Sequence, residues 1–232
     1  MPFSEKRYYS LDYYIKETFG EKLYKLSLDG GMTCPNRDGT LGNLGCIFCS
    51  AGGSGDFAAN RTLPIKEQLR EAKLLVQRKH TGSSYIAYFQ AYTNTYAPLP
   101  YLEKIFTEAI SEPDIQVLSI ATRPDCLSSE IINLLSWLNK RKPVWVELGL
   151  QTANDKTALY INRCYPTQVY IDAARELNKR NIPFVFTFGN HDDDCKVSKE
   201  LQKLVLGDEK PFTGRFADTL EPAYEKTKAE LG

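Results

Sequence analysis

The sequence predicts an α/β protein in which parallel strands alternate with helices. Short, nearly continuous apolar runs recur along the chain, and each is followed by residues with the periodicity of an amphipathic helix. Strands that are apolar throughout are typical of a parallel sheet that is covered by helices. The pattern fits a barrel-type (β/α) array or a doubly wound fold, and we expect a partial TIM-like (β/α) barrel with about five recognisable strands.

Strands and helices alternate from the first apolar run onward. A helix over residues 8–20 precedes this run and ends at a glycine. The next helix should bury Leu69, Leu74, Leu75 and Val76 in one stripe. The predicted strands span residues 22–28, 85–90, 115–121, 144–150 and 183–188. The helices that follow the strands are predicted at residues 64–79, 102–110, 128–140, 155–161 and 167–180.

The chain is predicted to form one main domain and a tail. Residues 1–188 hold the strand and helix pattern, whereas residues 189–232 are strongly polar and read as a divergent tail that we expect to be helical, without a clear sixth strand. In parallel α/β folds the loops after the strands meet at one edge, where chemistry takes place. The loop after the first strand, over residues 28–59, therefore lies on the functional side.

Composition places the chain among ordinary globular proteins. Of its 232 residues, 42% are hydrophobic and 25% are charged. Basic and acidic residues are equal at 29 each, so overall charge gives no argument for binding nucleic acid or an anionic membrane. No apolar run approaches the roughly 20 residues that cross a bilayer, and the first ten residues are too charged for a secretory signal. We expect a cytoplasmic protein without a membrane partner, whose six cysteines serve as thiols or metal ligands.

Three cysteines in a glycine-rich loop give the strongest chemical signal. Cys34, Cys46 and Cys49 have the spacing C-x11-C-x2-C, and glycines around them allow the backbone to curl so that the thiols converge. A structural zinc site needs four protein ligands, and the histidines, His80 and His191, lie at a predicted helix end and in the polar tail. The pattern favours an iron–sulfur cluster with one open iron over zinc or unliganded thiols.

Six motifs in order give this chain a resemblance to a known family. They are MTCPNRDG, GCIFCSAGGSGDFA, YFQAYTNTYAP, ATRPDCL, VELGLQT and INR. Over about residues 6–188 the chain resembles radical S-adenosylmethionine (SAM) enzymes, in particular the branch related to the Elongator catalytic subunit, in which the first cysteine spacing is longer than the usual three residues. Within that branch it is similar to bacterial proteins of unassigned substrate.

The resemblance implies a cofactor pair and an oxidoreductase reaction. Cys34, Cys46 and Cys49 match the ligands of a 4Fe–4S cluster, and SAM would chelate the open iron. One-electron reduction would cleave SAM to methionine and a 5′-deoxyadenosyl radical that abstracts hydrogen from a substrate. The implied partners are an electron donor such as flavodoxin or ferredoxin and a substrate that is RNA or a small metabolite.

The resemblance also implies SAM contacts on later strands. Gln90, Tyr92 and Thr93 stand where the family contacts the SAM amino group, at the end of the second strand. Gln151 and Arg163 match polar positions that contact SAM in the related oxygen-independent coproporphyrinogen oxidases. A guanidinium pairs well with a carboxylate, and the alternative for Arg163 is a solvated arginine at a helix end.

A carboxylate within the fourth strand needs a partner. Glu147 stands among Val144, Trp145, Val146 and Leu148, and burying even a neutral polar group without a partner costs about 2 to 7 kcal/mol. We therefore expect Glu147 to face the barrel interior and to find a donor such as Arg123. A structural ion pair and a role on the substrate side of the site both remain open for these two residues.

The chain departs from the family pattern near its end. Cys164 replaces the glycine that usually follows INR, and FTFGNHDDDCKVSKEL stands where the family has a Gly-Leu-Pro-Gly-Glu-type loop. A first rival function follows from this departure, namely a truncated, catalytically inactive remnant that binds a cluster. The resemblance to the Elongator branch, with the arginine and aromatic residues expected at the surface, suggests a second rival, a zinc-binding module associated with RNA. The remaining thiols are Cys126, Cys164 and Cys195, and for Cys126 and Cys164 we expect packing roles ahead of a second-cluster or redox role.

Overall fold

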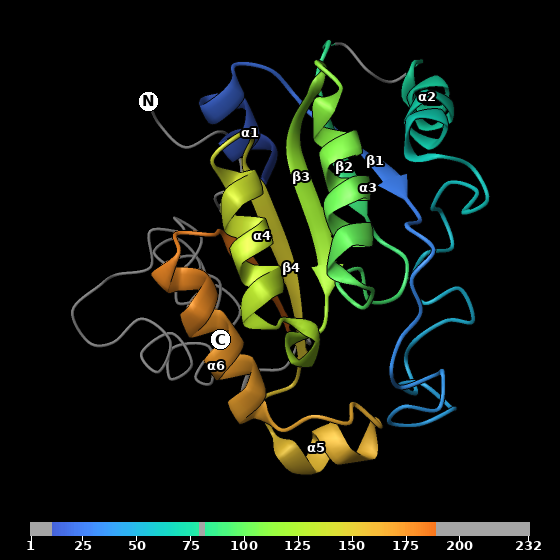
Figure 1. The fold of residues 1–232 in the computed structure, drawn as a ribbon, viewed down its shortest axis with the longest axis vertical. Coiled ribbons are helices and arrows are strands. Elements are labelled where there is room, and N and C mark those ends of the chain that lie inside the picture. The colour runs from blue at the N-terminus through green and yellow to red at the C-terminus, as the bar shows by residue number, and fades with distance from the viewer. Residues whose placement is uncertain (1–10, 79–81, 189–232) are drawn as a thin grey trace, which may run out of the picture.

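Five parallel strands form one sheet in the computed structural model of the chain, which describes residues 11–78 and 82–188 (Figure 1). The strands lie side by side in the order in which they occur in the sequence. A doubly wound sheet reverses its strand order at a switch point, so this unbroken order identifies the partial barrel. The strands are β1 (Tyr24–Leu28), β2 (Tyr85–Phe89), β3 (Ile115–Thr122), β4 (Val144–Gln151) and β5 (Phe184–Phe188).

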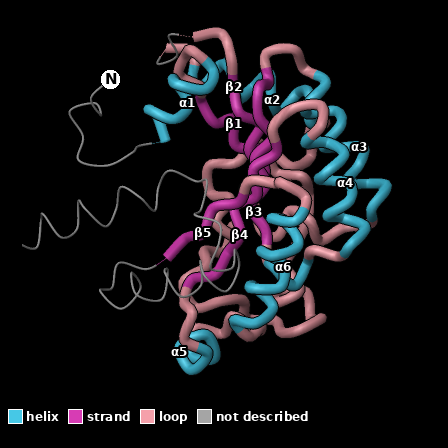
Figure 2. The backbone as a smooth tube through the Cα atoms, turned by 90° about the vertical axis from the view of Figure 1, so that its left-hand side faces the viewer, coloured by secondary structure: helices cyan, strands magenta, loops and turns pink. Residues whose placement is uncertain are grey.

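Helices cover one face of this sheet. Figure 2 shows α2, α3, α4 and α6 along one side of the strands, as right-handed crossovers between parallel strands require. The predicted alternation of strands and helices is thus confirmed, with bounds within a few residues of those expected. The helices are α1 (Leu11–Phe19), α2 (Ile65–Val76), α3 (Leu99–Ser111), α4 (Ser129–Asn139), α5 (Asp155–Tyr160) and α6 (Thr167–Lys179), and a 3-10 turn, η1, spans Pro124–Cys126.

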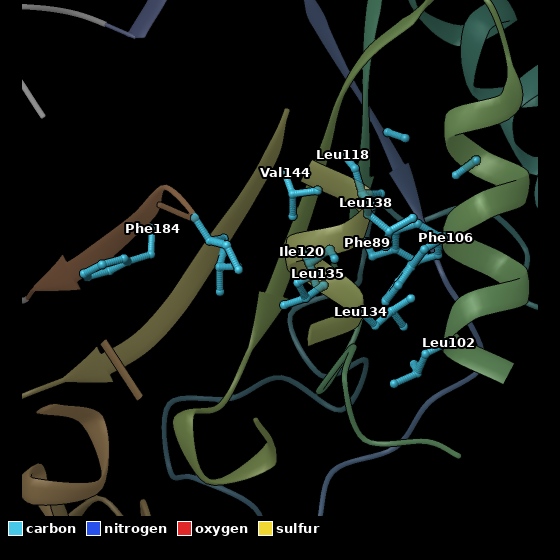
Figure 3. Packing of buried hydrophobic residues seen from close by; sticks show 14 of the residues in the cluster. Phe89, Leu102, Phe106, Leu118, Ile120, Leu134, Leu135, Leu138, Val144 and Phe184 are labelled. Carbon is cyan, nitrogen blue, oxygen red and sulfur yellow. The ribbon is translucent and has the colours of Figure 1, made fainter. Parts of the chain in front are cut away.

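The main core lies between the sheet and these helices (Figure 3). Phe89 of β2 packs edge-on against Phe106 of α3, with ring centroids 5.0 Å apart. Leu118 and Ile120 of β3 are fully buried in the same layer. Because successive side chains of a strand point to opposite faces, the residues between them belong to the other face, which we call the inner face.

A smaller apolar cluster closes the inner face at the amino ends of the strands. Trp145 lies near the start of β4, 7% exposed, and its ring is 6.0 Å from that of Tyr14 and 6.4 Å from that of Phe19. Ile15 of α1 is buried in the same cluster. Helix α1 therefore caps the amino end of the inner face and leaves the carboxyl ends of the strands to the loops.

The predicted stripe of α2 is wrong at two positions. Leu69 is 1% exposed, but Leu74 is 61% and Leu75 82% exposed. The buried face consists of Ile65, Gln68, Leu69 and Ala72, which recur at the three- and four-residue spacing of one helix face. Leu74 and Leu75 do not lie on that face. Gln68 has hydrogen-bond partners in the core. Its side-chain oxygen accepts from the main-chain amide of Asp29, and its side-chain NH2 group donates to the main-chain carbonyls of Asp29 and Leu63.

The predicted tail, residues 189–232, and His80 lie outside the described residues. The division into a core over residues 1–188 and this tail stays a prediction, as does the question of a sixth strand. Within residues 11–78 and 82–188 the structure has no helix long and apolar enough to cross a membrane.

Candidate cluster and cofactor site

The loop after β1 folds back on itself and brings distant cysteines together. The Gly45 amide donates to the Asn36 carbonyl at 2.8 Å, which closes the spacer between Cys34 and Cys46. The Cys49 amide donates to the Cys46 carbonyl at 3.0 Å in a tight turn. The long C-x11-C spacing is therefore compatible with one site, because most of the spacer forms a turn of its own.

Glycines let this loop approach β2 closely. The Tyr92 amide donates to the Gly53 carbonyl at 2.8 Å. Gly53 has a positive φ of 61°, and a Cβ there would come within 2.3 Å of the Tyr92 ring. A Cβ on Gly55 would lie 2.5 Å from the Cβ of Ala91. The loop is thus docked on the end of β2 by contacts that exclude any larger residue.

The three cysteines of the loop are half-buried and influence one another. Burial raises the pKa of the Cys46 thiol, while the Asn36 amide and the Arg123 charge lower it. The charges of Cys34 and Cys49 also raise the pKa of Cys46, because the three thiols lie near one another. The Arg123 Nη1 lies 4.0 Å from the Cys34 Sγ.

This donor set fits a thiolate-ligated cluster. The thiols are half-buried, the Arg123 cation lies beside Cys34, and the Asn36 amide lies beside Cys46. These surroundings suit an anionic iron–sulfur cluster, in which each cysteine thiolate binds a different iron atom. Among the described residues, no group of three or more His, Cys, Asp and Glu side chains is arranged to hold a metal ion. Cys34, Cys46 and Cys49 as cluster ligands therefore stay a prediction, supported by the chemistry of the donors.

The structure places the predicted SAM residues at the same edge of the sheet as the cysteine loop (Figure 1). Gln90 follows β2 and is half-buried, and its main-chain amide donates to the Leu28 carbonyl at 3.2 Å. Thr93 is 1% exposed. Tyr92, in the loop after β2, and Gln151, the last residue of β4, have positive φ values of 58° and 67°, a conformation often found near functional sites. Their contacts with SAM stay predictions.

Arg163 lies in the interior and has many partners. It is 1% exposed, so the alternative of a solvated arginine is wrong. Its Nη1 donates to the Leu150 carbonyl at 2.7 Å, and its Nε and Nη2 donate to the Tyr165 carbonyl at 3.0 and 2.8 Å. Asp155 lies 3.4 Å from the Nη2. A SAM contact would require Arg163 to exchange some of these partners, which at present hold the loop after β4 in place, and that contact stays a prediction.

The expected pair of Arg123 with Glu147 is wrong, because Arg123 is held by a nearer carboxylate. Its Nε and Nη2 donate to the two oxygens of Asp125 at 2.9 and 2.7 Å. Burial disfavours the charged form of Arg123, but the hydrogen bonds and charge of Asp125 outweigh it and raise its pKa. Arg123 is 9% exposed and stacks over Tyr165, 5.0 Å from the ring centroid.

Glu147 instead joins a polar cluster on the inner face. It pairs with Lys25 of β1 and accepts hydrogen bonds from Tyr88 at 3.0 Å and from Ser119 at 2.9 Å. The Lys25 Nζ also lies over the Tyr88 ring, 4.0 Å from its centroid. Burial, and then the charge of Glu147, raise the pKa of Tyr88. Sequence reasoning missed these donors, although each is a polar residue at the alternate position of its strand.

The remaining thiols lie in two settings. Cys126 is half-buried in η1, and burial together with the charge of Asp125 raises the pKa of its thiol to about 12. Cys164 is exposed and its Sγ lies 2.9 Å from the Oδ1 of Asn36, in the cysteine loop. Cys195 lies outside the described residues.

Comparison with known proteins supports the resemblance. Residues 39–201 match the family model of the radical SAM superfamily. The protein YtqA of Bacillus subtilis is 48% identical over 179 residues, which are 77% of this chain and 56% of YtqA. The protein YhcC of Escherichia coli is 43% identical over 157 residues, which are 67% of this chain and 50% of YhcC. The chain thus spans about half the length of the curated relatives that it matches.

Solved structures share the fold at low sequence identity. The archaeal Elp3 of Methanocaldococcus infernus has a TM-score of 0.53 at 15% identity, over 84% of this chain and 43% of that one. SuiB of Streptococcus suis has a TM-score of 0.51 at 16% identity, over 95% of this chain and 50% of that one. These likenesses show the fold alone.

Proposed function

Because the chain belongs to the radical SAM superfamily, we propose that it holds a 4Fe–4S cluster on Cys34, Cys46 and Cys49 and reductively cleaves SAM to act on a substrate. The observation that carries the proposal is the loop after β1, which holds three half-buried thiols, with Arg123 Nη1 4.0 Å from the Cys34 Sγ and Asn36 Nδ2 3.5 Å from the Cys46 Sγ. When bound, the cluster and SAM supply an electron transfer that yields methionine and a 5′-deoxyadenosyl radical, which takes hydrogen from the substrate.

The residues of the chain divide the work by position. The thiolates would bind the cluster, and the Arg123 charge beside Cys34 would offset its negative charge. Gln90, Tyr92 and Thr93, at the end of β2, would hold SAM. Gln151 at the end of β4 would serve the same cofactor. Helix α1 packs over the inner face at the amino ends of the strands, so the substrate would enter from the carboxyl ends.

The substrate side of the site is proposed on the inner face. Glu147 and Lys25 are 22% and 34% exposed at their side chains, so both can be reached from that face. Their charges, with the Tyr88 hydroxyl, would orient a polar substrate group. An RNA or a small metabolite as substrate and a flavodoxin or ferredoxin as electron donor belong to the same proposal, as does a cytoplasmic location, where cysteine thiols stay reduced.

Anaerobic reconstitution tests the proposal. Protein treated with iron and sulfide should show iron–sulfur absorbance, and should release 5′-deoxyadenosine when dithionite and SAM are added. A Cys34→Ala/Cys46→Ala/Cys49→Ala variant should lose both signals. Cys126→Ala is the matched control, because it removes a half-buried thiol that is not a proposed ligand, and it should keep both signals.

The rival functions predict different results. A catalytically inactive remnant would show cluster absorbance without 5′-deoxyadenosine. A zinc-binding module associated with RNA would contain one zinc and no iron on metal analysis. An absence of cluster absorbance in the wild-type protein, or unchanged absorbance in the triple variant, would overturn the proposed ligands.

A further inference from the structure

A buried asparagine in the cysteine loop lies against one of the proposed cluster ligands. Asn36 is 0% exposed, and its Nδ2 lies 3.5 Å from the Cys46 Sγ. The same nitrogen donates to the Asn162 carbonyl at 2.5 Å. Its Oδ1 accepts a hydrogen bond from the Cys164 thiol at 2.9 Å. The Asn36 side chain thus links the cysteine loop to residues 161–165, the loop that follows α5.

The partners of this amide fix its orientation. A main-chain carbonyl only accepts hydrogen bonds, so Asn36 must turn its NH2 group toward Asn162. The oxygen end then faces Cys164, whose thiol can donate. Reversing the amide would bring two acceptor oxygens together and would remove the donor from Cys46.

The two loops are joined by their backbones as well. The Gly45 amide donates to the Asn36 carbonyl at 2.8 Å, and the Asn162 Nδ2 donates to the Gly45 carbonyl at 2.7 Å. Asn162 and Cys164 have positive φ values of 57° and 65°, which residues other than glycine adopt uncommonly. The contacts therefore hold this loop in a conformation that keeps the Cys164 thiol against the amide.

We propose that Asn36 is a positioning residue that donates a hydrogen bond to Cys46 and thereby raises the reduction potential of the cluster, and that Cys164 holds the amide in this orientation. The inference rests on the proposed function, because it requires a cluster on Cys46. Hydrogen bonds to the ligand sulfurs tune the potential of such clusters, and a donor favours the reduced form because it offsets the added negative charge. Since Asn36 is fully buried, water cannot replace the lost donor in a variant.

A redox titration of the reconstituted protein, in which electron paramagnetic resonance reports the reduced cluster, tests the role of Asn36. Asn36→Asp keeps the shape of the side chain and removes the NH2 donor, so the midpoint potential should become more negative than in the wild type. Asn43→Asp is the matched control for charge, because Asn43 is an exposed asparagine of the same loop. Its shift should be smaller than that of Asn36→Asp.

A second pair of variants decides the matter if Asn36→Asp holds no cluster. Cys164→Ala removes the donor to the Asn36 oxygen and should also make the potential more negative, whereas Cys164→Ser keeps a donor and should retain the wild-type value. Equal potentials in Cys164→Ala, Cys164→Ser and the wild type, or equal shifts in Asn36→Asp and Asn43→Asp, would overturn the inference and leave the proposed function standing. A wild-type protein that forms no cluster would overturn both.

Discussion

Tyr165 contacts two guanidinium groups through its ring and joins the loop after α5 to the sheet. Its ring centroid is 4.4 Å from the Cζ of Arg163 and 5.0 Å from that of Arg123, and its hydroxyl donates to the Gly149 carbonyl at 2.5 Å. Burial raises the pKa of Tyr165 well above its ordinary value. The tyrosine therefore stays neutral while its ring contacts both cations.

Substitutions at Tyr165 should separate the ring from the hydroxyl. Tyr165→Phe loses only the hydrogen bond to Gly149, and should lower the free energy of unfolding by about 1 kcal/mol. Tyr165→Ala also loses the packing of the ring against Arg123 and Arg163, and should lower the free energy of unfolding by about 4 kcal/mol. Urea denaturation measures both values. Equal losses in the two variants would contradict the stacking role of the ring.

The thiols of Cys126 and Cys164 should differ in reactivity. Only a thiolate attacks an alkylating reagent, and the pKa of Cys126, raised to about 12, keeps this thiol protonated at pH 8. Iodoacetamide should therefore modify the exposed Cys164 in the native protein much faster than Cys126, as peptide mass spectrometry can show. In urea the two rates should become similar, since unfolding removes the burial. Equal rates in the native protein would contradict the buried setting of Cys126.

For single residues, the sequence indicates which side chains need a partner, but it indicates less well which partner each one finds. A carboxylate in an apolar strand requires donors, and this requirement correctly predicts that Glu147 is satisfied. The donors, Lys25, Tyr88 and Ser119, come from three other strands, so the register of the whole sheet decides which side chains meet. Arg123 is nearer to Glu147 in the sequence than Lys25 is, but it pairs with Asp125.

For helix α2, the sequence likewise predicts the element but not the contacts that it makes. Its periodicity predicts a helix correctly, but leucines occur on two of its faces, and only contacts with β1 and α3 decide which face is buried. Strand order was likewise open, because a barrel and a doubly wound sheet share one alternating pattern. The positions of the strands were predictable because each is a short apolar run between turn signals.

A matched pair of substitutions in α2 tests which face is buried. Leu69→Ala removes a side chain that is 1% exposed, and should lower the free energy of unfolding by about 3 kcal/mol through the cavity it leaves. Leu75→Ala removes one that is 82% exposed, and should change it by less than about 0.5 kcal/mol. Urea denaturation compares them. The opposite ranking would mean that the helix is rotated about its axis.

For the whole molecule, the site depends on contacts between segments far apart in the sequence. The cysteine loop reaches the loop after α5, where the Ile47 amide donates to the Ile161 carbonyl at 3.1 Å and Asn36 contacts Cys164. The sequence indicates that both loops follow strands, and hence that they share an edge. Which residues touch across that edge depends on the curvature of the sheet, and local patterns do not encode it.

Cluster binding should stabilise this edge in preference to the sheet. A ligand that binds the folded loop adds to its stability, and local opening of the loop becomes rarer. Hydrogen exchange in residues 34–55 should slow on reconstitution with iron and sulfide, while exchange in β3 and β4 should stay the same. The Cys34→Ala/Cys46→Ala/Cys49→Ala variant, treated in the same way, should show no change. Equal slowing over the whole sheet would contradict a local effect.

The close fit of Gly53 and Gly55 against Tyr92 and Ala91 has a consequence for how variation in this chain is interpreted. Neither glycine bears a group that could ligate a metal or move a proton, yet an alanine at either position would push the loop away from β2. A survey of mutational tolerance should therefore find that these two glycines tolerate substitution as poorly as the cysteines do. From that result alone, the glycines would be mistaken for residues that take part in the chemistry. Their intolerance is steric, and at Gly53 the positive φ adds backbone strain, so a smaller residue at position 92 should restore only part of what an alanine at Gly53 removes.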